Sequence, residues 1–380
     1  MSTPQYWRVS TVQVGLGTIA REWGRIGCVG FGGPPAHIAL LRDLCVTRRG
    51  WLTDTEFEDG IAVTNLLPGP ASTQLAILCA WRLRGALGAI VGGLCFIVPG
   101  LVLILALAVI FLADNAPAWV LGAAAGAGAA VPAVAAHAAT GLVPGSWKRV
   151  GTETPARARW VAYLVAGGIA AAVTGPWVVL VLVIAGVMEM SVRAPSDRRL
   201  AWPLVAALPG GGGLVWVAAK VGALSYGGGF VIIPLMRQDA VHTYGWMTDS
   251  QFLNAVALGQ ITPGPVVQTV AVVGYAAAGI AGGLLAAAVA FAPSFVFVIV
   301  GGPRLERLRD NDRAQAFLTG AGAAAIGAIA GAVVPLAWSL HQWWQFALLA
   351  VAVVWLLVLR GGVVTTLVGA GVVGGLISLL

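Results

Sequence analysis

The sequence contains one module twice, and this repeat limits the folds that the chain can adopt. The segment Trp51-Leu52-Thr53-Asp54 returns as Trp246-Met247-Thr248-Asp249, 195 positions later. The motif LPGP at 67–70 returns at the same distance as TPGP at 262–265. Upstream, the same offset pairs Arg25 with Lys220 and the glycines at 32–33 with those at 227–228. A match that includes Trp, Pro and Gly without gaps is not a chance event, so the fold is built from two related halves.

Composition decides the solvent in which these halves fold. Hydrophobic residues make up 59% of the 380 positions and charged residues only 10%, against about 25% charged in soluble domains. This balance excludes both a soluble globular protein and a disordered chain. We therefore predict an all-α, polytopic integral membrane protein. Its apolar stretches cover 86–112, 118–144, 160–190, 282–301, 314–338, 345–359 and 361–380, with a hairpin break at 174–176.

Basic clusters between these stretches indicate how each half is oriented. The positive-inside rule places Arg82 and Arg84, the central loop 148–159, the join at 193–199 and the loop 302–313 in the cytoplasm. At the offset of 195, the four arginines of 302–313 face a segment, 107–118, that has none. We therefore predict an inverted repeat of halves 1–190 and 203–380, joined by a cytoplasmic linker 191–202. The inverted repeat requires 203–219 to cross the membrane. The pair Arg42 and Arg237, which are basic at equivalent places in the two halves, argues against the inverted repeat.

Broken apolar segments predict re-entrant hairpins in both halves. Residues 60–80 have basic flanks on both sides and the helix-breaking Pro68-Gly69-Pro70 at the centre, and 26–41 have Gly32-Gly33. The matching places in the second half hold Gly227-Gly228 and Pro263-Gly264-Pro265. Irregular backbone is tolerated at membrane depth only where protein or water covers it, so we expect these tips to meet near the midplane. Pro70 and Pro265 suit the first helical position, and the following free N–H groups suit an anion. The alternative is that each PGP merely kinks a packed helix.

Several side chains near the tips are candidates for contact with an anion. Gln74 and Gln268 lie about one turn into the helices after the two PGP motifs. At the offset of 195 they are not partners, since Gln74 matches Thr269 and Gln268 matches Thr73. His37 follows the first tip and could donate to an anion. Arg25 and Lys220 are matched cations, for which the alternative is a side chain that snorkels to the interface.

Acidic residues give no comparable pattern. No repeat-matched pair of carboxylates lies at a tip, so a cation site or a proton relay has less support than an anion site. Thr53 and Thr248 are predicted helix N-caps, with Glu56 completing a capping box. No cofactor, metal site or catalytic residue is predicted.

Taken together, the motifs resemble those of the chromate ion transporter family, in its long-chain, two-half form. The first half carries FGGPPAHI at 31–38, RRGWL at 48–52 and LPGP at 67–70, followed by Gln74. The second carries YGGGFVIIPL at 226–235, GWM at 245–247 and GQITPGP at 259–265. Gln260 stands in the second half where the first has Asn65. The resemblance implies export of chromate, a tetrahedral dianion, from the cytoplasm, with resistance to chromate as the result.

Two other functions remain open at this stage. One is a transporter of the same build for sulfate or another oxyanion. The other, with less support, is an intramembrane enzyme that acts on lipid phosphate, which would need a carboxylate or His beside an Arg at a tip. The expected partners are chromate, sulfate as competitor or counter-substrate, and the lipid bilayer. Nucleic acid is not expected, and a homodimer is the candidate assembly. The expected location is the bacterial plasma membrane, with multiple spans.

Overall fold

A computed structural model describes most of the chain. The described residues are 14–113, 116–174, 178–193, 213–225, 232–301 and 311–380, apart from Leu66 and Pro68. These residues form helices and no strand, which confirms the predicted all-α class. Four of these helices are long and apolar enough to cross a bilayer: Ala71–Phe111, Ala118–Val150, Val266–Gly301 and Asp312–Trp338.

The first half begins with two helical hairpins. Helix α1 (Leu16–Val29) is followed at a glycine turn by α2 (Gly33–Arg42), and α3 (Asp54–Thr64) is followed by α4 (Ala71–Phe111). Gly32 and Gly33 have φ angles of 98° and 71°, which suit glycine at the first tip. Helix α4 reverses at Gly85, with φ 60° and ψ −151°, so that it consists of a short arm and a long arm. Gly88 and Gly92 in the long arm approach Ala80 in the short arm. The breaks predicted at Gly32-Gly33 and between α3 and α4 are therefore present, whereas the reversal at Gly85 was not predicted.

The second half repeats this arrangement. Helices α8 (Gly213–Leu224), α9 (Ile232–Arg237) and α10 (Asp249–Ile261) precede α11 (Thr269–Gly301), which reverses at Gly279 with φ 64° and ψ −158°. A 3-10 turn over Val266–Gln268 leads into α11. As predicted, Thr53 and Thr248 each cap their helix within a capping box; the partner is Glu56 in α3 and Gln251 in α10.

The two reversal points correct the predicted alignment of the halves. Gly85 and Gly279 are 194 positions apart, as are Pro99 and Pro293 inside the long arms. The second half has therefore lost one residue directly after its PGP motif, and Gln74 and Gln268 are equivalent. The prediction that these two glutamines are not partners was wrong, because a single offset of 195 was applied across a gap.

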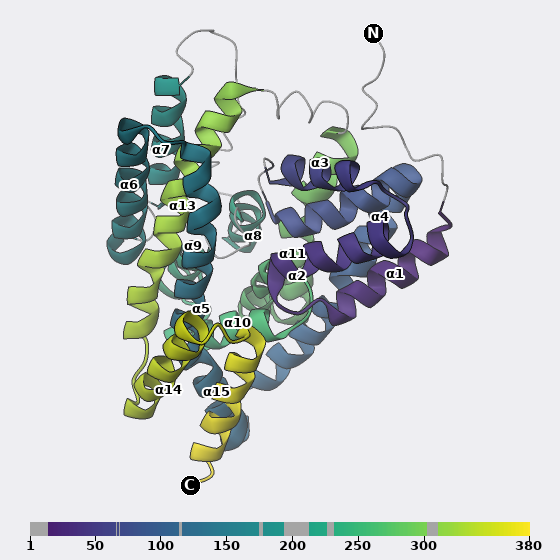
Figure 1. The fold of residues 1–380 in the computed structure, drawn as a ribbon. Helices are drawn as coiled ribbons and strands as arrows, with labels where there is room; N and C mark the ends of the chain where they lie inside the picture. The colour runs from purple at the N-terminus through teal and green to yellow at the C-terminus, as the bar shows by residue number, and fades with distance from the viewer. Residues whose placement is uncertain are drawn as a thin grey trace, which may run out of the picture.

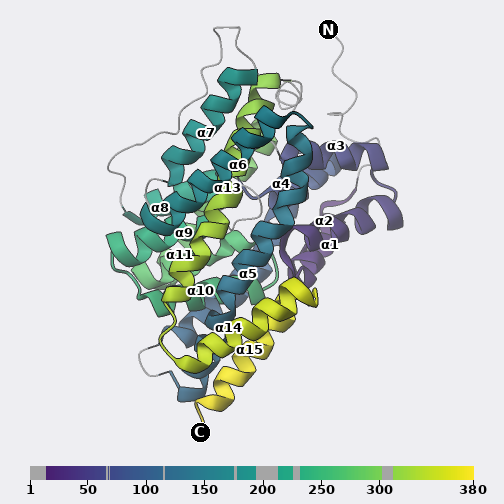
Figure 2. The same ribbon diagram turned by 60° about the vertical axis from the view of Figure 1, so that its left-hand side comes forward.

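The remaining helices of each half pack against helices of the other half. The first half continues with α5 (Ala118–Val150), α6 (Thr154–Ile169) and α7 (Val178–Arg193), and the second with α13 (Asp312–Trp338), α14 (Trp343–Val353) and α15 (Val363–Ile377). Helix α5 lies along α14 and α15, whereas α13 lies along α6 and α7 (Figure 2). Glycine permits the close approach: Gly126 of α5 contacts Ala370, and Gly327 of α13 contacts Leu164. The halves are therefore interleaved in space.

The long arms of α4 and α11 point in opposite directions. Helix α4 ends at the end of the molecule where α5 begins, and there Gly122 of α5 contacts Gly374 and Ser378 near the C-terminus. Helix α11 ends at the other end, where α13 begins beside α7 and Gly320 contacts Ala185 (Figure 1). This geometry confirms the inverted repeat. Residues 203–212, which were predicted to begin a crossing, lie outside the described residues, and 213–219 belong to α8.

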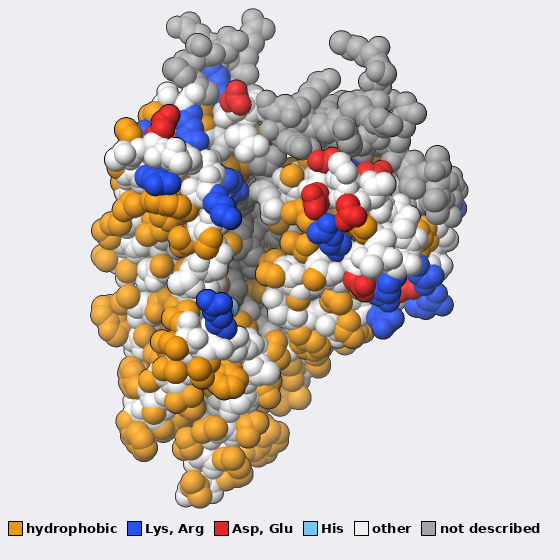
Figure 3. Space-filling model, viewed as in Figure 1, with side chains coloured by type: hydrophobic (Ala, Val, Ile, Leu, Met, Phe, Trp, Pro, Cys, Tyr) orange, Lys and Arg blue, Asp and Glu red, His pale blue; other side chains and the backbone are white. Residues whose placement is uncertain are grey.

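Charged and apolar side chains separate along the long axis of the molecule. Basic residues of the predicted cytoplasmic loops lie where α5, α6 and α7 meet; Arg193, for example, donates to the Val150 carbonyl over 3.4 Å. In Figure 3 charged side chains gather in the upper part of the visible face, and most of the lower part is apolar. Exposed Val102, Trp338 and Val351 belong to the apolar surface that the bilayer would cover.

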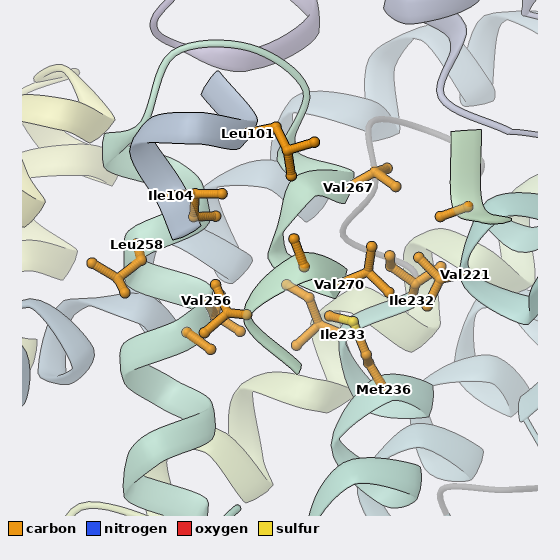
Figure 4. Packing of buried hydrophobic residues seen from close by; sticks show 14 of the residues in the cluster. Leu101, Ile104, Val221, Ile232, Ile233, Met236, Val256, Leu258, Val267 and Val270 are labelled. Atoms are coloured by element: carbon orange, nitrogen blue, oxygen red, sulfur yellow. The ribbon is translucent and has the colours of Figure 1, made fainter. Parts of the chain in front are cut away.

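The core lies between the two halves. Leu101 and Ile104 of the α4 long arm are buried in one cluster with Val221, Ile232, Val256 and Val270 of the second half (Figure 4). This packing holds the long arm of the first half against the hairpins of the second.

Candidate functional site

One predicted tip of each half meets the other: the glycine tip of the first half is hydrogen-bonded to the second PGP motif. The Gly264 amide, in the second PGP motif, donates to the Gly30 carbonyl at the first tip over 3.0 Å. A Cβ placed on Gly33 would lie 3.8 Å from Val266, directly after that motif. Broken backbone from both halves is therefore covered by protein, which the hydrocarbon region of a bilayer would require.

His37 fixes the first tip from inside. The imidazole is fully buried, and its Nε2 lies 2.9 Å from the Gly30 carbonyl. A carbonyl only accepts, so Nε2 carries the proton and, in the neutral ring, Nδ1 accepts from the Ser72 hydroxyl over 3.2 Å. His37 thus links the first tip to the first turn of α4 and leaves no donor for an anion in this conformation.

The first PGP motif faces the second half. Gly69 has a φ of 117°, which favours glycine, and a Cβ placed on it would lie 3.2 Å from the Gly222 carbonyl oxygen and 3.5 Å from Ser294 Oγ. The same position lies 2.7 Å from Gln74 Nε2. The start of α4 is therefore bordered by α8 and by the long arm of α11.

The second PGP motif faces the first half in the same manner. Gln268 donates from Nε2 to the Ile97 carbonyl over 2.8 Å, across the boundary between the halves. Gly100 lies against this motif, since a Cβ there would be 2.0 Å from the Pro263 carbonyl oxygen and 2.6 Å from Gln268 Oε1. Gly100 and Ser294 are equivalent at the corrected offset of 194.

Both PGP motifs precede helix starts with free backbone donors. Pro70 is the N-cap of α4, and Pro265 is the N-cap of the 3-10 turn before α11. The predicted first helical position is therefore one residue too early. The N–H groups of Ala71 and Ser72 lie ahead of the first intrahelical bond, in which Thr73 N–H donates to Pro70.

Several buried polar atoms at this meeting point have no hydrogen-bond partner within the described residues. Thr73 Oγ1, Ser294 Oγ and Gln268 Oε1 belong to fully buried side chains, and Gln260 Nε2 belongs to a side chain that is 7% exposed. Leaving such a group unpaired costs about 1–3 kcal/mol. Two hydroxyls and one amide donor are therefore available to something other than protein.

The two predicted cations lie on α1 and α8, the helices that precede the glycine tips in the sequence. Arg25 is exposed on α1. Lys220 forms an ion pair with Asp239 and lies over the ring of Trp216, 5.5 Å from its centroid.

The other matched cations stand at the hairpin flanks. Arg42 pairs with Asp54 over 2.6 Å, and the equivalent Arg237 pairs with Asp249 over 2.7 Å. Hydrogen bonds to the carboxylates of Asp54 and Glu58 raise the pKa of Arg42 further above its ordinary value, so this flank stays charged.

Three predicted site residues, Pro68, Gly227 and Gly228, lie outside the described residues. Conversely, Ser72, Thr73, Gly100 and Ser294 were missed by sequence reasoning. A gap after the second PGP motif would have aligned Gly100 with Ser294, so the sequence held a signal for that pair.

Comparison with known proteins identifies the family. A sequence profile described as Chromate transporter matches residues 17–190 and 212–375, and so covers both halves. The chain belongs to the chromate transporter family. Members of this family are transporters, so transport is favoured over the lipid-phosphate enzyme considered above.

Curated chromate transport proteins align with most of this family member. It is 35% identical over 329 residues to the chromate transport protein of Cupriavidus metallidurans, covering 82% of the chain and 80% of the relative. It is 31% identical over 336 residues to a probable chromate transport protein of Synechococcus elongatus, covering 84% of each. It is 31% identical over 333 residues to the chromate transport protein of Pseudomonas aeruginosa, covering 82% and 79%. No solved structure matches this chromate transporter. Family and helices together establish a multi-pass membrane protein.

Proposed function

We propose that this protein exports chromate from the cytoplasm and thereby confers chromate resistance. The observation that carries the proposal is the meeting of broken helix tips from two inverted halves, where buried hydroxyl and amide groups lack partners. The family and the names of the relatives supply the substrate class.

Neutral donors suit a tetrahedral dianion. A helix start contributes backbone N–H groups and about half a positive charge from the helix dipole. Hydroxyl and amide groups add donors that can surround four oxygens without a fixed cation. An ion pair between a fixed cation and the anion would slow release of the anion. Several hydrogen bonds of about 1.5–3 kcal/mol each can instead break one after another.

Release requires the two halves to separate at the tips. The Gly264 to Gly30 hydrogen bond and the Gly100 contact hold the tips together in this conformation. An alternating-access cycle would open the tips first to one side and then to the other, as inverted repeats permit.

The membrane potential favours export. Moving one charge across 100 mV is worth about 2.3 kcal/mol, so a dianion leaving a negative interior gains roughly 4–5 kcal/mol per 100 mV. Export therefore needs no second ion, and sulfate, with the same shape and charge, is the expected competitor.

The test is chromate uptake into everted membrane vesicles that contain the protein. We expect accumulation that grows with an imposed inside-positive potential and falls with excess sulfate. Vesicles with folded, inserted protein that accumulate no more chromate than empty ones would contradict the proposal. Accumulation that does not depend on the potential would support chromate transport but exclude the membrane potential as its driving force.

A further inference from the structure

Two buried hydroxyl groups differ from the other helical Ser and Thr residues of this protein. Most of the latter donate to a carbonyl one turn earlier: Thr64 to Gly60 over 2.9 Å, Ser225 to Val221 over 2.7 Å and Thr262 to Leu258 over 2.8 Å. Such a bond is always within reach of a helical hydroxyl. Thr73 and Ser294 are fully buried, and their hydroxyl oxygens have no partner among the described residues.

Both hydroxyl groups lie near the start of α4. Thr73 lies in its first turn, directly after the first PGP motif. Ser294 Oγ reaches the same motif from the long arm of α11, 3.5 Å from the Cβ position of Gly69. Hydroxyl donors from both halves therefore accompany the free N–H groups of this helix start.

The equivalent place in the second half lacks both hydroxyl groups. At the offset of 194, Thr73 corresponds to Val267 and Ser294 corresponds to Gly100. The nearest hydroxyl there, Thr269, is already bonded to the Val266 carbonyl over 2.8 Å.

The side-chain amide of Gln268, at the second helix start, is held by the first half. Gln268 Oε1, a hydrogen-bond acceptor without a partner among the described residues, lies 2.6 Å from the Cβ position of Gly100. Its amide nitrogen is held by Ile97, which fixes the direction of the oxygen. One of the two N–H donors of Gln268 is therefore already occupied.

We propose that the transporter has one oxyanion site per chain, at the start of α4, and that the hydroxyl groups of Thr73 and Ser294 bind the anion. This inference rests on the proposed function and adds that the two halves are not equivalent toward the substrate. The first half supplies the site, and the second supplies Ser294 and closes against it through Gly264.

The experiment measures KM for chromate in everted vesicles for Ser294→Ala and Thr73→Val. Loss of one hydrogen bond to a charged ligand should raise KM about ten-fold or more. The matched control is Thr269→Val, which removes a buried hydroxyl from the corresponding helix start and should leave KM within about two-fold. Thr73→Ser keeps the hydroxyl and should keep the KM of the original protein, so the idea stays testable even where Ser294→Ala fails to fold.

Equilibrium binding of radioactive chromate to the purified protein provides the second measurement. We expect one anion per chain, and a loss of affinity in Thr73→Val that parallels its change in KM. Two anions per chain, or equal KM values in Thr73→Val, Ser294→Ala and Thr269→Val, would overturn the single site. Absence of chromate transport by the unaltered protein would instead remove the proposed function itself.

Discussion

The Gly264 amide of the second half donates to the Gly30 carbonyl of the first half, at a distance of 3.0 Å. The same carbonyl also accepts from His37 over 2.9 Å. One backbone oxygen therefore joins a broken helix from each half, and any movement that opens the tips must break or shift this pair of bonds.

Replacement of Gly264 by Ala should impair transport at this link. Gly264 has a φ of 97°, and a Cβ there would lie 3.2 Å from Gln268 Nε2. The left-handed conformation alone costs a residue with a side chain about 1–2 kcal/mol. We expect a lower melting temperature in detergent and a large fall in chromate uptake.

Gly245 provides the control for that substitution. It also has a positive φ, 62°, but its Cβ position has open space around it. Gly245→Ala should therefore lose similar stability and retain uptake per folded molecule. Equal loss of uptake in both variants would mean that backbone strain, not the tip contact, is responsible.

His37→Phe should weaken the first tip without changing its volume much. The substitution removes the bonds to Gly30 and Ser72, while the ring keeps its edge contact with Phe96 at 5.1 Å. The Ser72 hydroxyl loses its partner, so we expect about 1–3 kcal/mol of destabilisation. Thermal unfolding and uptake would both be measured, with substitution of the exposed His242 in the η5 segment (Gln238–Thr243), His242→Phe, as the control. A stable, fully active His37→Phe protein would show that the bond is dispensable.

The sequence predicted the fold closely because its strongest signals are physical constraints on membrane helices. Apolar stretches predicted the spans, and glycine and proline marked the breaks that precede α2, α4 and α11. The reversals at Gly85 and Gly279 were not predicted. The unequal distribution of arginines between equivalent loops of the two halves predicted the inverted orientation, even though Arg42 and Arg237 argued against it. Those two residues are hairpin flanks, bound to Asp54 and Asp249, and report on local structure instead.

The site was harder to predict, because charge alone selected Arg25 and Lys220. Lys220 forms an ion pair with Asp239, which gives its charge a structural role. No pattern in the sequence reveals which buried hydroxyls will lack a partner. Ser294 becomes a candidate only when the long arm of α11 is seen to touch Gly69. Contacts between residues this far apart in the chain are decided by packing.

Gly100→Ala should separate the α4 long arm from the second PGP motif. The added methyl group would lie 2.0 Å from the Pro263 carbonyl oxygen, so backbone would have to move. Gly141→Ala is the matched control, because its Cβ position in α5 has open space and alanine favours a helix by roughly 0.5–1 kcal/mol over glycine. We expect Gly100→Ala to lower both stability and uptake, and Gly141→Ala to lower neither. A Gly100→Ala protein with normal uptake would contradict tight closure at this point.

Glu189→Gln should reduce stability and leave the affinity for chromate unchanged. The Glu189 carboxylate, 2% exposed, accepts from Arg159 over 2.8 Å, from Arg193 over 2.5 Å and from Tyr163 over 3.2 Å, which fastens α7 to α6 away from the tips. Loss of its charge leaves two partly buried guanidinium groups without a counter-ion, so we expect about 1–3 kcal/mol of destabilisation.

Asp54→Asn is the comparison for this substitution, because the Asp54 carboxylate is 68% exposed in its pair with Arg42 and should contribute less than about 1 kcal/mol. Thermal unfolding of both variants, together with KM for chromate, separates the two roles. An increase in KM for Glu189→Gln at unchanged melting temperature would contradict a purely structural role for this cluster.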